Sequence, residues 1–221
     1  MDLTLDPVEI RVAAALAEKE LATPDYYPMS LNALAAACNQ KTGREPVMDL
    51  AEDEIARALD RLMRQGLAGT SSGAGSRVEK YRHNLAGHFG LNEAELSVLA
   101  VLMLRGPQTV GEVRSRTGRM HAFEELEGAE AALRALAERD EPLVTELPLQ
   151  PGRKEPRWAH LLGGPVEAEA GDAPAPTAPA AMQQARASGD RIAELEGRVE
   201  ALEGELGDLQ EAFERFRKQF E

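Results

Sequence analysis

Apolar residues recur every three or four positions in three stretches near the start of the chain, a spacing that places them on one face of a helix. The three stretches are 7–20, 31–38 and 52–65. Asp6 and Ser30 stand where capping residues commonly begin a helix, and Gly66 stands where a glycine commonly ends one. Two extended runs follow, at 67–71 and 77–82, and flank a turn of small residues. This pattern predicts three helices and a β-hairpin.

The same order of elements recurs about 85 residues further along the chain. The predicted helices are 92–104, 110–117 and 126–139, and the predicted strands are 143–147 and 157–162. Three helices followed by a hairpin is the order of a winged helix. We therefore predict a mainly α fold with small β-hairpins, built as tandem winged-helix domains at residues 1–88 and 89–163.

The last quarter of the chain has a different pattern. Residues 164–189 are rich in Ala, Pro and Gly without apolar periodicity, which predicts a disordered linker. In residues 190–221, apolar positions alternate spacings of three and four, which is typical of a coiled coil. Its core positions are Ile192, Leu195, Val199, Leu202, Leu206, Leu209, Phe213, Phe216 and Phe220. We predict a C-terminal coiled-coil helix that forms a homodimer; a helix that packs on its own chain or docks on another protein is the alternative.

The charge and the cysteine content limit the environment and the partners. The net charge of −13 argues against dense, nonspecific phosphate binding, although it leaves room for one local basic surface. The single cysteine, Cys38, excludes an intrachain disulfide. The start of the chain lacks the pattern of a signal peptide, and no apolar run approaches the roughly 20 residues that span a bilayer. We expect a cytoplasmic protein without a membrane segment.

Motifs for catalysis are missing from the sequence. The four histidines are isolated, and no phosphate-binding loop, nucleophile elbow, paired-cysteine motif or zinc-protease motif occurs. We therefore expect no enzymatic activity, no catalytic residues, no cofactor and no metal site.

Basic residues gather in the third helix and the hairpin of the first module. They are Arg57, Arg61 and Arg64 in the helix, and Arg77, Lys80 and Arg82 in the hairpin. In a winged helix the third helix enters the major groove of DNA and the wing touches the backbone, so these residues predict a DNA-binding surface. The alternative is a solvated helix face on which Asp53 pairs with Arg57 and Asp60 with Arg64. The third helix of the second module carries few basic residues, which favours contact with a protein or a backbone there.

The stretch CNQKTGREPVM at residues 38–48, with Leu104-Arg105-Gly106 and the PGRKE stretch at 151–155, resembles the YceH family. The resemblance spans about residues 3–163 and implies tandem winged helices, without an assigned activity. Within it, Lys41 and Arg44 belong either to the DNA surface or to a structural loop. Ala51 departs from the capping serine expected of the family, and Asp49 or Asp53 is the expected substitute cap.

Two functional hypotheses follow from these patterns. The first is a DNA-associated or transcription-regulatory protein that binds duplex DNA through the first module and dimerises through the C-terminal helix. The second is a protein–protein adaptor that uses its winged helices as the accessory subunits of chromosome-condensation complexes do. The net charge of −13 favours the adaptor, whereas the arginines of residues 57–64 favour DNA.

Overall fold

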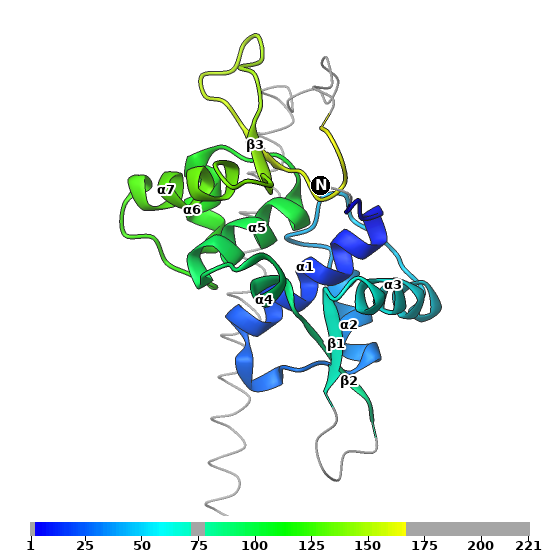
Figure 1. Ribbon diagram of the computed structural model, residues 1–221. Coiled ribbons are helices and arrows are strands. Elements are labelled where there is room, and N and C mark those ends of the chain that lie inside the picture. Colours follow the sequence, from blue (N-terminus) through cyan, green and yellow to red (C-terminus); the bar gives the residue numbers. More distant parts are fainter. Residues whose placement is uncertain (1–2, 72–77, 167–221) are drawn as a thin grey trace, which may run out of the picture. The chain divides into compact units, whose positions relative to one another are not determined.

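The computed structural model describes residues 3–71 and 78–166 (Figure 1). Its helices are α1 (Pro7–Ala22), the 3-10 turn η1 (Pro24–Tyr26), α2 (Leu31–Cys38), α3 (Glu52–Arg64), α4 (Leu85–Phe89), α5 (Glu93–Arg105), α6 (Val110–Thr117) and α7 (Leu126–Ala137). Its strands are β1 (Ala68–Ser71), β2 (Lys80–His83), β3 (Val144–Glu146) and β4 (Trp158–His160). The prediction of a mainly helical chain with small antiparallel strand pairs is confirmed. The predicted coiled coil and nearly all of the predicted linker lie outside the described residues.

Side-chain caps begin most of the long helices where the sequence predicts them. The Asp6 carboxylate accepts hydrogen bonds from the Val8 and Glu9 amides, both 2.8 Å long, and so fixes the start of α1. At α3 the expected cap is wrong, because neither Asp49 nor Asp53 provides it. Instead, the Glu54 carboxylate accepts a hydrogen bond from the Ala51 amide at 2.8 Å.

The two predicted modules each contain an isolated β-bridge that the sequence patterns do not reveal. In the first half, Met29 precedes α2 and forms an antiparallel bridge with Tyr81 of β2. In the second half, Gln108 precedes α6 and forms the same kind of bridge with Trp158 of β4. Each hairpin therefore gains a one-residue third strand at the equivalent place, an arrangement that fits the predicted tandem winged helices.

The core runs without interruption from the first half into the second. Helix α1 packs along α5 (Figure 1), and all residues of α5 from Leu96 to Leu104 are buried. The alanine-rich segment 12–17 of α1 is also wholly buried, because small side chains let the two helices approach closely. The predicted boundary at residue 88 falls inside α4, a short helix that the apolar pattern does not predict. In the described part of the chain, no helix is both long and apolar enough to cross a membrane.

Candidate nucleic-acid interface

Helix α3 starts with acids and carries its basic residues further along. The first turn holds Glu52, Asp53 and Glu54. Their negative charges interact favourably with the helix dipole, but they repel phosphate. The Arg57 side chain is 60% exposed and lies 2.8 Å from the carboxylate of Asp53. The predicted solvated pair of Asp53 and Arg57 is therefore present, while Asp60 and Arg64 form no such pair within the described residues.

Arg61 is engaged by the neighbouring helix. Its guanidinium lies 2.6 Å from Asp6 and 2.7 Å from Glu9, the two carboxylates that also cap α1. The hydrogen bond to Glu9 is the main cause that raises the pKa of Arg61. Arg61 therefore ties α3 to the start of α1, and a phosphate would have to displace two carboxylates to reach it.

Three residues of the predicted DNA-binding surface are exposed and could contact a phosphate. Arg64, at the end of α3, and Lys80 and Arg82, in β2, are solvent-exposed. In residues 3–71 and 78–166, none of the three side chains has a hydrogen bond or an ion pair. Since side chains alternate along a strand, Lys80 and Arg82 lie on the outer face of the hairpin, opposite Tyr81 and the buried His83.

Arg44 is a correction to the predicted DNA surface, because the residue is 4% exposed. Its guanidinium binds both carboxylate oxygens of Glu18, at 3.2 and 2.5 Å. It also donates to the carbonyl oxygens of Ala37 and Gly43. No group is left for a ligand, so Arg44 is a structural residue.

The loop around Arg44 is likewise fixed by its own side chains. Asn39 exchanges two hydrogen bonds of 2.8 Å with the backbone of Leu50, which closes the loop. Arg11, 2% exposed in α1, donates to the carbonyl oxygens of Cys38 and Pro46. These contacts favour the structural alternative for this stretch. Lys41 stays exposed in it, and Arg77 of the predicted DNA surface lies outside the described residues.

A polar cluster around the buried His83, which the sequence does not signal, joins β2 to α1. His83 Nε2 binds the carboxylate of Glu20, while His83 Nδ1 accepts the Leu85 amide at 3.1 Å. The Tyr27 hydroxyl accepts the His83 amide at 2.8 Å. Burial lowers the pKa of His83, so the ring is neutral, with its proton on Nε2. Every ring nitrogen already has a partner, which marks the cluster as structural.

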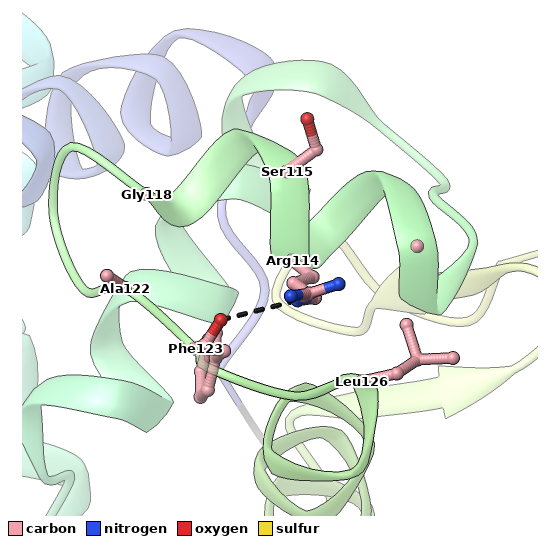
Figure 2. A pocket seen from close by; sticks show the side chains of 7 residues that line it. Arg114, Ser115, Gly118, Ala122, Phe123 and Leu126 are labelled. Carbon is pink, nitrogen blue, oxygen red and sulfur yellow. Dashed lines mark hydrogen bonds between the residues drawn. The ribbon is translucent and has the colours of Figure 1, made fainter.

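A hollow of about 370 Å³ lies on the second module between α6 and the segment that leads into α7 (Figure 2). It is lined by Gly111, Arg114, Ser115, Gly118, Ala122, Phe123 and Leu126. Arg114 is the one charged lining residue, and its guanidinium donates to the carbonyl oxygens of Phe123 and Glu124. Leu126 is 44% exposed beside it. The hollow is thus open, largely uncharged and bordered by an exposed apolar side chain.

Two further buried groups, the Cys38 thiol and the His160 ring, have shifted pKa values. Burial raises the pKa of the Cys38 thiol to about 12, which keeps it protonated and unreactive. Burial lowers the pKa of His160 to about 4, so that ring is neutral as well. Among the described residues, no group of three His, Cys, Asp or Glu side chains could hold a metal ion.

Comparison with known proteins gives matches that extend over the whole chain. The family model of DUF480, a protein of unknown function, matches residues 5–153. A UPF0502 protein of Geobacter metallireducens is 53% identical over 221 residues, covering all of both chains. The UPF0502 protein of Azoarcus sp. is 49% identical and covers 98% of this chain and 94% of its own.

Proposed function

This chain belongs to the DUF480 family, also called UPF0502, the YceH-like family of bacterial proteins whose function is uncharacterised, and we propose that it is a non-catalytic, DNA-associated protein. In this proposal the first module holds duplex DNA through Arg64, Lys80 and Arg82. The observation that carries the proposal is the exposure of these three cations, without carboxylate partners in the described residues, on a helix and hairpin in winged-helix order.

The proposed contacts are with the DNA backbone. The acidic first turn of α3 makes a poor entry into the major groove, since carboxylates repel the phosphates on either side. Arg57 faces Asp53 and Arg61 faces two carboxylates, so neither is set to read a base. Contacts through the last turn of α3 and the outer face of β2 position a protein on DNA without reading its sequence. Weak sequence preference and strong salt dependence are the expected properties.

Fluorescence anisotropy with labelled duplexes of several sequences tests this proposal. The combined variant Arg64→Ala, Lys80→Ala, Arg82→Ala should bind at least tenfold more weakly at about 50 mM salt. The matched control removes three exposed cations of the second module by Arg134→Ala, Arg153→Ala and Lys154→Ala, and should bind as the wild type does. Equal losses in both variants would show that only net charge matters, and equal affinity in the first variant would refute the assigned surface.

The adaptor hypothesis is the second candidate, and the hollow of the second module favours it. Small residues leave room for an apolar side chain there, and exposed Leu126 adds to the apolar rim. Photo-crosslinking in cells of the native host tests the adaptor hypothesis. One variant carries the crosslinking residue in place of Leu126, and a control variant carries it in place of Arg134. One discrete protein adduct at position 126 alone is expected of an adaptor. No adduct at either position would count against it.

Self-association is a further part of the proposal, and it rests on the apolar pattern of residues 190–221. A lone amphipathic helix of this length is marginal in water, so a partner helix is the simplest cover for its apolar side. Two copies of a DNA-associated module would then be linked in one dimer, which raises the effective concentration of the second copy at the DNA.

A further inference from the structure

The end of α5 is clamped by the loop that holds Arg44. The Glu45 amide donates a hydrogen bond of 2.8 Å to the Leu104 carbonyl oxygen. Gly43 has a φ of +73°, and a Cβ built on it would lie 3.0 Å from Arg105 Nη2 and 3.6 Å from Cζ. The Arg105 guanidinium therefore lies close against the backbone of Gly43, in a position that a side chain at residue 43 would obstruct. This contact places Arg105 at the junction of the two modules.

Arg105 differs from the other arginines of this junction. Arg11 binds two carbonyl oxygens, Arg44 binds Glu18, and Arg116 lies 3.3 Å from Glu112. Arg105 is partly buried, and within the described part of the chain its guanidinium has no hydrogen bond or ion pair. Its nitrogens are not fully buried, so they can donate to an acceptor that arrives from solvent, and a charge-assisted hydrogen bond in a partly buried place is stronger than one in bulk water.

Two of the three charges that shift the pKa of Arg105 are positive. Burial is the main cause that lowers the pKa of Arg105, and the charge of Arg116 lowers it next. Glu18 opposes this effect, but both of its carboxylate oxygens already bind Arg44, whose charge also lowers the pKa of Arg105. Exposed Lys41 and Glu45, two residues before and after Gly43, add one charge of each sign to the same loop. An anion beside Arg105 would offset this repulsion and provide the missing acceptor.

We infer that the Arg105 guanidinium, held against Gly43 and flanked by Arg116, binds a phosphate oxyanion at the junction of the two modules. A guanidinium donates two parallel hydrogen bonds to two oxygens of a tetrahedral phosphate, a geometry that an ammonium group does not offer. The phosphate can come from a nucleic-acid backbone or from a free phosphate compound, and both share this chemistry. The site does not depend on the proposed DNA contacts of Arg64, Lys80 and Arg82, which lie on α3 and β2.

Calorimetric titration of the full chain with inorganic phosphate and with pyrophosphate, at constant ionic strength, tests the site. Arg105→Gln should bind pyrophosphate at least tenfold more weakly than the wild type. Arg134→Gln removes the same charge from an exposed position on α7 and should leave binding unchanged. Arg105→Lys keeps the charge if Arg105→Gln fails to fold, and should weaken binding at least threefold because the paired hydrogen bonds are lost.

Absence of wild-type binding to both phosphate and pyrophosphate at millimolar concentration overturns the inference. So does a wild-type affinity in Arg105→Lys, or in a folded Arg105→Gln. A competition experiment identifies the source of the phosphate. Displacement of a bound duplex by pyrophosphate from the wild type, but not from Arg105→Lys, assigns the site to a backbone phosphate. Pyrophosphate binding that leaves a bound duplex in place assigns the site to a free phosphate compound. Pyrophosphate binding by a chain that binds no duplex gives the same assignment.

Discussion

A substitution that breaks the contact between Arg44 and Glu18 distinguishes a structural role of Arg44 from a DNA-binding role. We predict that Glu18→Ala lowers the free energy of unfolding, because it leaves a guanidinium with 0% side-chain exposure without a counter-charge. Removing one partner of a buried ion pair costs about 3–5 kcal/mol. Since the Glu18 side chain is 22% exposed, water reaches the vacated position, and we expect a loss of about 2–3 kcal/mol. Against a typical total of about 5–15 kcal/mol, such a loss is readily measured.

The companion variants make this prediction specific. Arg44→Met removes the buried charge but leaves the carbonyl oxygens of Ala37 and Gly43 without a donor, at a cost of about 1–3 kcal/mol. The double variant should lose about 1–2 kcal/mol less than the sum of the losses in the two single variants, because both substitutions remove the same ion pair.

Urea unfolding followed by circular dichroism, at one fixed protein concentration, measures these values. Glu130→Ala breaks the exposed pair with Arg134 and serves as the control, with no resolvable change expected. If Glu18→Ala cost less than about 0.5 kcal/mol while Arg44→Met weakened DNA binding, Arg44 would be a surface contact and its structural assignment would be wrong.

Two further predictions concern pH and the C-terminal helix. His160 has a folded-state pKa of about 4 and an unfolded value near 6.5, so unfolding takes up a proton below pH 6.5 and stability falls between pH 6.5 and 4. The loss over this range is about 3 kcal/mol, and His160→Leu should remove it from the pH dependence of urea unfolding. An unchanged pH slope would refute the role of His160. Truncation after Gly163, or Leu202→Asp with Leu209→Asp, should convert a dimer into folded monomers in light scattering, because a charge in the apolar seam has no partner. A full chain that is monomeric at tens of micromolar would show that the tail is a docking helix.

Local sequence signals predict most helices and strands of the described residues. The capping residues and apolar spacing predict α1, α2, α5 and α6 nearly to the residue. The pair of Asp53 and Arg57 is also predictable, since its partners lie four residues apart on one helix. Helix α4 is missed because a five-residue helix with only Leu85 buried shows no periodicity.

Side-chain partners that are distant in the sequence explain most of what could not be predicted. Arg44 looks like a surface arginine until the fold brings Glu18 to it from 26 residues away. Arg61 meets Asp6 and Glu9 across more than 50 residues, so the regular arginine spacing in α3 suggests a continuous basic stripe that the fold interrupts. The bridge from Met29 to β2 is a single residue pair, which leaves no pattern of its own.

The salt dependence of duplex binding by the wild-type chain tests the central claim most directly. Each phosphate contact contributes a slope of about −0.9 in a plot of log binding constant against log salt concentration. Three contacts, through Arg64, Lys80 and Arg82, predict a slope of about −2.7, which should be nearly the same for duplexes of unrelated sequence. The variant that lacks all three cations should show a slope smaller by about that amount. A wild-type chain that binds no duplex at low salt, or a slope that the three substitutions leave unchanged, would contradict the account.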